Sequence, residues 1–229
     1  MDLGLELVEG RFLERLNRFA ALVEVGGKAV LCHVANSGRM RELFVPGFRV
    51  LLKPCSGKHR KTQFDLALVD LGSSLSSADA RLPNALVAEA LDLGSLPQFQ
   101  EYPHVRREVT FGESRLDLML EGSGGRFYIE TKSVTLVVDG VGLFPDAPTI
   151  RGAKHMGSLA QAVAEGHRAA AIFVVQRGDV NSFATNDEAD PVFGVAFREA
   201  LTAGVEAYAY SCRVSERAIS LSCPLPIQL

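Results

Sequence analysis

Short apolar runs separated by turn residues fill the first third of the chain. They lie at residues 19–25, 29–34, 48–52 and 64–69, and the glycine pair at 26–27 is typical of a tight turn between two strands. Several short strands within about 70 residues predict a small OB-like β-barrel. An SH3-like barrel would give a similar pattern, so the two remain alternatives at this point.

The remainder of the chain mixes helical and strand patterns in the order αβββαβ. A helical stretch at 83–91 precedes three strand patterns, and a second helical stretch at 149–165 precedes the apolar run 169–175, which is typical of a buried strand. The three strand patterns lie at 105–111, 115–120 and 126–134. This order predicts an α/β domain.

A third helix is expected to begin after Asp190, a suitable N-cap that is followed at once by Pro191. Gly204 marks its end, which we place at Ala203. Two further strands, at 205–210 and 218–222, are then expected at a sheet edge.

One stretch rich in glycine and serine, 71–79, separates the two kinds of pattern. We therefore expect a two-domain α/β protein, with an OB-like barrel at 1–76 and a second domain at 77–229. The 229 residues, 47% of them hydrophobic, suffice for packed cores. The longest apolar run is far shorter than the roughly 20 residues of a membrane helix, and the acidic start lacks a secretory signal, so we expect a cytoplasmic protein.

Three charged residues interrupt strand patterns that otherwise predict burial. Asp117 lies in the second strand of the αβββαβ order, and Glu130 and Lys132 lie two apart in the third, on one face. Two carboxylates brought together in this way suit Mg²⁺ or Mn²⁺, and the ammonium can orient a water molecule. Asp on the second strand and Glu-x-Lys on the third resemble the core of the PD-(D/E)xK nuclease superfamily. The alternative is an incidental buried ion pair.

Cysteine spacing and net charge exclude other classes of protein. Cys32, Cys55, Cys212 and Cys223 are scattered without a C-x-x-C pair, so neither a zinc knuckle nor a disulfide framework is expected, and we interpret them as core thiols. A formal net charge of -3 argues against a protein that coats nucleic acid through bulk charge. Any such binding has to come from local basic patches.

One such patch is expected between residues 33 and 61, where seven Lys or Arg residues stand against a single acid, Glu42. Arg39, Arg60 and Lys61 are our candidates there for nucleic-acid contact, and the turn that begins at Asn36 could present backbone N–H groups to phosphate. A solvated face and simple turn geometry are the alternative interpretations.

Two helices add further candidates. Glu89, on the first helix of the second domain, is either an additional metal ligand or a solvent-facing residue. Arg151, Lys154 and His155 are spaced so that they could grip phosphate from one helix, although a single histidine often has a structural role. Asp146 is a candidate cap for that helix.

With these patterns in place, the chain resembles the sugar fermentation stimulation protein A family along nearly its whole length. The resemblance implies an N-terminal OB-like domain, in which we take Arg15 and Arg18 as candidates for nucleic-acid contact. It also implies a nuclease-like domain with Asp117, Glu130 and Lys132 as site residues. It also implies DNA binding without marked sequence preference and a regulatory role in the use of sugar, notably maltose. The motifs that carry it lie at 15–19, 32–40, 46–47, 84–87, 114–117, 130–136, 144–149, 151–155 and 204–206.

Two segments depart from the family pattern. Leu16 and Asn17 stand where an aromatic residue and a lysine are usual, and residues 78–83 replace the usual approach to the first helix. If the barrel touches DNA at the first segment, its binding is expected to be weaker than in relatives.

Two hypotheses about function remain open from the sequence. In the first, Asp117 and Glu130 hold Mg²⁺ or Mn²⁺ and Lys132 helps activate the water that cleaves a phosphodiester. In the second, the protein binds DNA, or RNA, without catalysis, and the acidic residues are an idle scaffold. A homodimer is compatible with both hypotheses.

Overall fold

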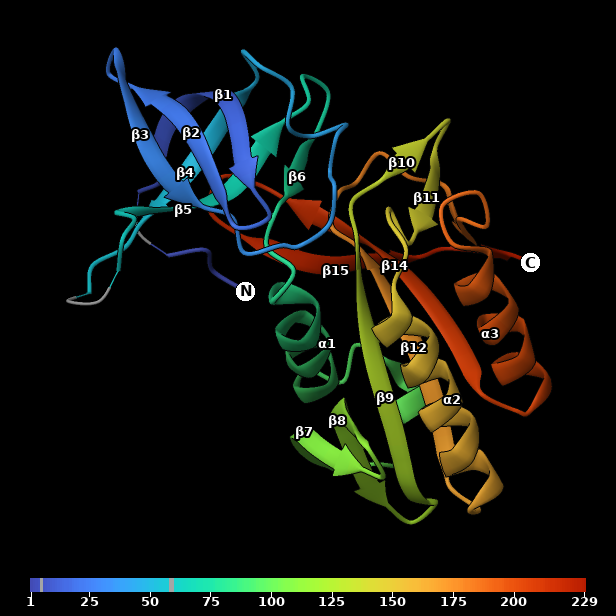
Figure 1. Cartoon of the computed structure of the whole chain (residues 1–229). Coiled ribbons are helices and arrows are strands. Elements are labelled where there is room, and N and C mark those ends of the chain that lie inside the picture. Colours follow the sequence, from blue (N-terminus) through green and yellow to red (C-terminus); the bar gives the residue numbers. More distant parts are fainter. Residues whose placement is uncertain (5, 58–59) are drawn as a thin grey trace.

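The computed structural model describes residues 1–4, 6–57 and 60–229, and places the barrel above an α/β domain (Figure 1). The expected OB-like barrel is confirmed, since its five strands form a closed sheet in the order β3-β2-β1-β4-β5, with parallel pairing between β3 and β5. The strands are β1 (Val8–Asn17), β2 (Ala20–Val25), β3 (Lys28–His33), β4 (Arg49–Pro54) and β5 (Phe64–Asp70).

Strand β1 was not predicted as a strand, although it pairs with both β2 and β4. Only Gly10 and Phe12 are buried along it, and bulges interrupt its register, so the apolar alternation that signals a strand is weak. Phe12 is nevertheless a centre of the barrel core, where Val23, Leu52 and Leu66 are also buried.

The segment rich in glycine and serine contains a sixth strand, β6 (Leu75–Ser77), which pairs with β5. Ser77 also donates its backbone N–H to Gln176 of the second domain at 3.0 Å. The expected division after residue 76 falls within this strand. The segment is therefore a hydrogen-bonded junction between the domains and not a loose linker.

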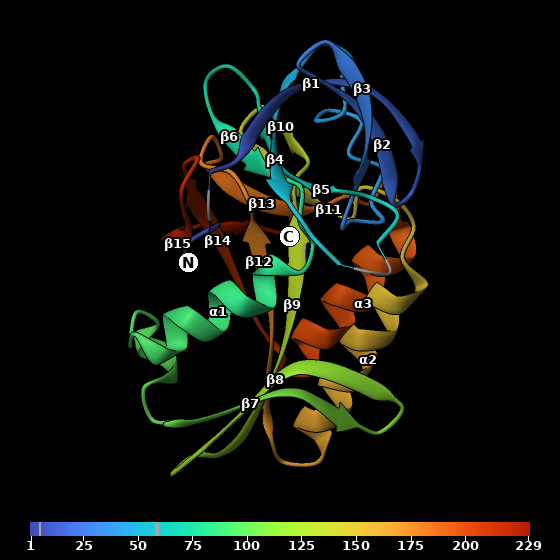
Figure 2. The same cartoon turned by 90° about the vertical axis from the view of Figure 1, so that its left-hand side faces the viewer.

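The second domain has the expected αβββαβ order. Its central sheet runs β15-β14-β12-β9-β8-β7, with α1 packed on one face and α2 and α3 on the other (Figure 2). The helices are α1 (Leu82–Asp92), α2 (Ile150–Ala164) and α3 (Pro191–Thr202). The strands are β7 (His104–Phe111), β8 (Ser114–Gly122), β9 (Gly125–Val134), β12 (Arg168–Val175), β14 (Glu206–Val214) and β15 (Ile219–Pro224), and a short 3-10 helix spans Pro97–Phe99.

A small second sheet in the order β10-β11-β13-β16 was not predicted. Its strands have two to four residues each, too few for a periodic pattern. They are β10 (Val137–Val138), β11 (Val141–Phe144), β13 (Ser182–Thr185) and β16 (Ile227–Gln228).

Helix capping follows the predictions in one case and departs from them in another. Asp190 caps α3 as expected, because its side chain accepts a hydrogen bond from the backbone N–H of Phe193. For α2 the prediction of Asp146 was wrong: Thr149 is the N-cap, and Asp146 Oδ2 accepts from the backbone N–H of Met40 in the barrel, at 2.9 Å. None of the helices among the described residues is both long and apolar enough to cross a membrane.

Candidate functional site

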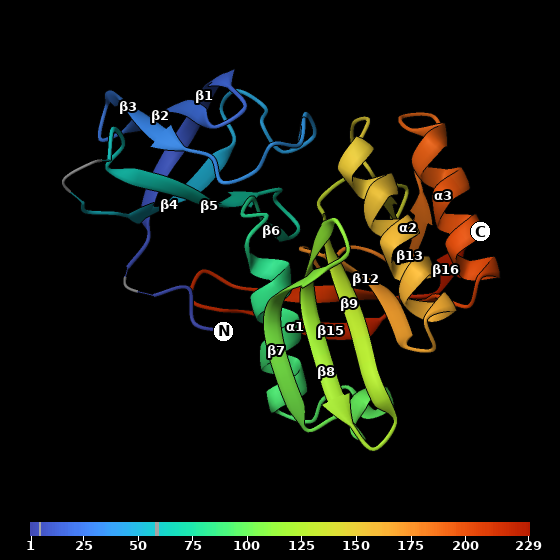
Figure 3. The same ribbon diagram turned by 60° about the horizontal axis from the view of Figure 1, so that its bottom comes forward.

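The two expected site acids lie where strands β8 and β9 stop pairing. Strands β8 and β9 lie side by side (Figure 3). The ladder between them runs from Gly122 opposite Gly125 to Leu118 opposite Ile129, and Asp117 and Glu130 come directly after its last pair. Asp117 Oδ2 instead accepts hydrogen bonds from the backbone N–H of Thr131 at 2.8 Å and from its hydroxyl at 2.6 Å. Asp117 is thus held against the residue between Glu130 and Lys132.

Glu130, Lys132 and His155 form a buried cluster under helix α2. Lys132 Nζ donates to Glu130 Oε1 at 2.8 Å, and His155 Nδ1 contacts the same oxygen. Arg151 Nε donates to His155 Nε2 at 3.2 Å, which assigns the imidazole proton to Nδ1 and makes His155 a donor to Glu130. Each of Glu130, Lys132 and His155 is less than a tenth exposed.

The two acids have opposite electrostatic environments. Burial, followed by the charge of Glu130, raises the pKa of Asp117 in spite of its hydrogen bonds from Thr131. Burial also acts to raise the pKa of Glu130, but the hydrogen bond from His155 and the charge of Lys132 outweigh it, so that this pKa is lowered. Neighbouring acids whose pKa values are shifted in opposite directions are typical of functional sites.

The donor set fits a hard divalent cation. Among the described residues, no hydrogen-bond partner reaches the buried oxygen Oε2 of Glu130. The described part of the chain contains no group of three His, Cys, Asp or Glu side chains arranged to hold a metal. Mg²⁺ is commonly bound by one or two carboxylates together with water and substrate phosphate, so two carboxylates are a sufficient number of protein ligands for such a site.

Asn84 is a site residue that our sequence reasoning included only as part of a family motif. It projects from α1 and donates through Nδ2 to Asp117 Oδ1 at 3.2 Å, while Arg107 Nε donates to Asn84 Oδ1 at 3.1 Å. From the helical periodicity of the sequence, Asn84 can be predicted to be partly buried, but no contact with Asp117 can be predicted. Its contact with Asp117 depends on how α1 crosses the sheet.

The prediction of Glu89 as a metal ligand was wrong. Its carboxylate binds the N-terminal ammonium of Met1 at 2.7 Å, and that ammonium also donates to the carbonyl of Ile219 at the start of β15. Three strands of the central sheet separate β15 from β8, which carries Asp117. Glu89 is instead a partly exposed helix residue, close to our alternative interpretation.

The expected phosphate-gripping group on α2 does not form. His155 is buried in the cluster with Glu130 and Lys132, and Arg151 contacts it from the same helix face. Lys154 lies elsewhere on the helix and pairs with the exposed acid Glu113 at 3.2 Å. The nucleic-acid prediction for His155 is therefore corrected to a role beside Glu130.

Arg15 and Asn36 have structural tasks in the barrel. The Arg15 guanidinium donates to the carbonyls of five residues and lies over the ring of Phe44, so its hydrogen-bonding groups are not free for phosphate. Asn36 is one of those residues, and its side chain also accepts from the backbone N–H of Gly38 at 2.9 Å, which is turn geometry. Both therefore shape the loop.

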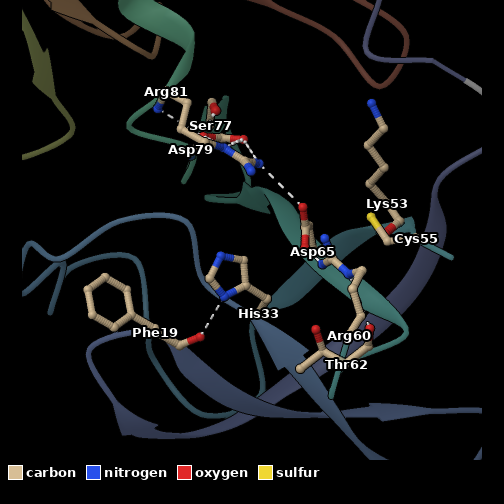
Figure 4. Close-up of polar contacts among 10 residues, drawn as sticks. All are labelled: Phe19, His33, Lys53, Cys55, Arg60, Thr62, Asp65, Ser77, Asp79 and Arg81. Carbon is tan, nitrogen blue, oxygen red and sulfur yellow. Dashed lines mark hydrogen bonds and ion pairs between the residues drawn. The ribbon is translucent and has the colours of Figure 1, made fainter. Parts of the chain in front are cut away.

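The remaining basic residues of the 33–61 segment do not form a single patch. Arg60 and Arg81 both point at the buried carboxylate of Asp65 (Figure 4). Arg49 pairs with Glu9, Asp70 and Glu216. Lys58, which we counted in the segment, lies outside the described residues. Arg18, Arg39 and Lys61 are exposed, and no acidic side chain of the described residues pairs with them.

Comparisons with known proteins cover both domains. A family model described as "Sugar fermentation stimulation protein RE domain" matches residues 81–218, and one described as "SfsA N-terminal OB domain" matches residues 13–76. The sugar fermentation stimulation protein homolog of Desulforamulus reducens is 47% identical over 224 residues, which cover 98% of this chain and 93% of the relative. The homolog of Caldanaerobacter subterraneus subsp. tengcongensis is 46% identical, with 94% of each chain covered.

A solved structure is similar along its full length. It is the structure of Pyrococcus furiosus SfsA in complex with Ca²⁺, which is 30% identical, covers 100% of both chains and has a TM-score of 0.90.

Proposed function

The chain belongs to the sugar fermentation stimulation protein family, and on this premise we propose that it is a DNA-binding protein with a metal-dependent phosphodiesterase site. The observation that carries the proposal is the pair Asp117 and Glu130 at the point where β8 and β9 stop pairing, which we call the β8–β9 fork. Oε2 of Glu130 is buried there and lacks a hydrogen-bond partner among the described residues. The Pyrococcus furiosus relative was solved in complex with Ca²⁺, which supports cation binding in proteins of this fold.

Asp117 and Glu130 would hold Mg²⁺ or Mn²⁺, which when bound neutralises phosphate charge and polarises the phosphorus–oxygen bond. Asn84 and Thr131 fix the carboxylate of Asp117, while His155, itself held by Arg151, fixes that of Glu130. Lys132, next to Glu130, would orient the attacking water and stabilise negative charge on the phosphate oxygens.

We also propose a link to the regulation of sugar use, notably of maltose. The description of the family names sugar fermentation and supports the part of this link that concerns sugar, and DNA binding would provide the means. The alternative is a regulatory protein that binds DNA without sequence preference and without cleavage.

Metal binding and cleavage test the proposal together. Mn²⁺ binding followed by electron paramagnetic resonance, and cleavage of a labelled oligonucleotide, are expected for the wild type. Asp117→Asn and Glu130→Gln are expected to abolish both. Lys132→Gln is expected to slow cleavage by roughly 10²-fold while DNA affinity stays near that of the wild type.

Glu89→Gln is the matched control, since it removes an acid of the same domain that lies away from the fork, and both readouts are expected to persist. Wild-type protein that binds the metal but cleaves nothing with Mg²⁺, Mn²⁺ or Ca²⁺ would support the non-catalytic alternative. Absence of metal binding would overturn the proposed site.

A further inference from the structure

A basic pocket lies between the barrel and the segment that leads into α2. It has a volume of about 630 Å³ and is lined by residues that include Arg18, Arg39, Arg41, Phe44 and Pro148. The barrel loop after β3 contributes one wall, and it lies beside the start of α2 (Figure 3). Pockets of this size hold ligands as large as a nucleotide.

The positive charge of this pocket is not neutralised by its neighbours. Arg18, Arg39 and Arg41 are exposed, and no acidic side chain of the described residues forms an ion pair with them. Asp146 brings one negative charge close to Arg15, against the four arginines that line the pocket. Three guanidinium groups that lack an acidic partner in the described part of the chain surround one hollow, which favours an anionic ligand.

The pocket is also rigid and partly apolar. Arg15 holds its wall through five carbonyls, and Asp146 ties that wall to the second domain. Phe44 and Pro148 supply apolar surface inside, and Phe19, beside Arg18, is 53% exposed at the tip of the β1–β2 hairpin. Arginine and aromatic groups together suit an unpaired nucleotide, whose base stacks while its phosphate is bound.

The pocket is connected to the acidic site through one short helical segment. Pro148 precedes Thr149, the N-cap of α2, and the next turns carry Arg151 and His155. The six residues of α2 from Ile150 to His155 rise roughly 9 Å, so Pro148, two positions before the helix, and His155 are close enough for one strand to reach both places. A continuous duplex presents its stacked bases inward and cannot insert one into a hollow.

We propose that this pocket receives an unpaired nucleotide, so that single-stranded DNA, or a single-stranded end of a duplex, is the preferred ligand. The inference rests on the proposed function for the choice of DNA and deepens it. Arg39 and Arg41 bind the phosphates of the unpaired strand, and the strand then follows α2 toward Asp117 and Glu130.

The test is fluorescence anisotropy of the full chain in EDTA, where cleavage does not interfere. Three labelled probes share one sequence: a single strand, a blunt duplex, and a duplex with a single-stranded overhang. We expect the single strand and the overhang to bind at least about tenfold more tightly than the blunt duplex, as one stacked base would provide. Arg39→Gln with Arg41→Gln is expected to remove this preference.

Arg126→Gln is the matched control, because it removes an exposed arginine at the far end of the β8–β9 hairpin and should leave the preference unchanged. Equal affinity for the three probes would overturn the inference, and so would an equal loss in the control. Cleavage without strand preference refutes this inference alone. Strand preference without metal binding or cleavage refutes only the proposed phosphodiesterase.

Discussion

The two carboxylate oxygens of Glu130 have different surroundings, and this difference defines the site at the scale of a residue. Oε1 receives Lys132 and His155, whereas Oε2 is buried and has no hydrogen-bond partner among the described residues. A buried acceptor without a partner costs roughly 1–3 kcal/mol, and a bound cation would remove this cost. The side chain is therefore anchored on one oxygen and open to a ligand on the other.

Asp117 and Glu130 are expected to change the stability of the metal-free protein with opposite dependence on pH. Burial and Glu130 raise the pKa of Asp117, so the folded protein binds that proton more tightly than the unfolded chain. The charged carboxylate thus destabilises the fold above the raised pKa, and this penalty declines as the pH falls through it. Asp117→Asn should be more stable than the wild type at neutral pH, with an advantage that shrinks on acidification.

Glu130 provides the comparison with the opposite sign, because its pKa is lowered in the folded protein. Its stabilising contribution is present above the unfolded value near 4.5 and is lost as the pH falls through the folded value. Glu130→Gln should therefore lose stability at neutral pH. Urea unfolding in EDTA, from neutral pH down to acidic pH, measures the stability of Asp117→Asn and Glu130→Gln relative to the wild type. If the two stability differences had the same sign, the opposite pKa shifts of Asp117 and Glu130 would be contradicted.

At this scale the sequence indicates the proposed site residues more plainly than the residues that position them. Asp117, Glu130 and Lys132 interrupt apolar runs, which is visible in one dimension. Asn84 and the role of His155 depend on where α1 and α2 cross the sheet, and spacing along the chain does not contain that information.

At the scale of elements, Asp190 connects two helices. Its Oδ1 accepts from the backbone N–H of Phe193 at 3.0 Å to cap α3, and its Oδ2 accepts from the N–H of Thr149 at 2.7 Å, at the start of α2. Asp190 is buried, with 6% of its surface exposed. One side chain therefore sets the relative position of the helices that cover the site.

Asp190→Ala should lower the free energy of unfolding by about 1–3 kcal/mol, because two N–H groups lose their acceptor. Glu188→Ala removes an exposed acid two residues earlier and is expected to change stability by less than about 0.5 kcal/mol. Chemical denaturation of both variants checks this expectation. A similar loss in both would show that charge, and not capping, is responsible.

Elements with long apolar periodicity were predicted and short ones were not. Strand β12 is buried at nearly every position, so its pattern is plain in the sequence. Strands β10 and β16 have two residues each and exist only because neighbours supply their hydrogen bonds. A pairing partner distant in the chain is not visible to a local pattern.

At the scale of the whole molecule, Gly38 marks a close approach of the two domains. A Cβ added there would lie 2.7 Å from Asp146 Oδ2, the oxygen that accepts from Met40. A side chain at this position would therefore force Asp146 away from its partner. The absence of a side chain at Gly38 allows the domains to dock.

Gly38→Ala should cost about 1–2 kcal/mol through the loss of the Asp146–Met40 hydrogen bond. Gly157→Ala is the matched control, since an added Cβ in α2 meets no heavy atom within 4 Å and should stabilise the helix by roughly 0.5–1 kcal/mol. Thermal unfolding of the two variants should shift in opposite directions. If the unfolding temperature of Gly38→Ala were equal to that of the wild type, tight docking of the domains at Gly38 would be refuted.

Charge distribution was the least predictable property at this scale. The 33–61 segment is strongly basic in sequence, yet the partners of Arg49 lie at Glu9, Asp70 and Glu216, far apart along the chain. Counting charges within a window cannot register neutralisation by distant acids. Which arginines lack an acidic partner among the described residues therefore depends on the fold and not on the local sequence.

The junction formed by β6 also determines how the domains can be produced separately. Ala78 and Ala80 donate backbone hydrogen bonds to the barrel residues Ala67 and Ala35. A fragment that stops at residue 76 would therefore discard these bonds and the pairing of Ser77 with Leu68, which opens part of the outer edge of β5 and invites aggregation. A recombinant barrel that extends through Ala80 keeps its last strand intact and is the better choice for expression.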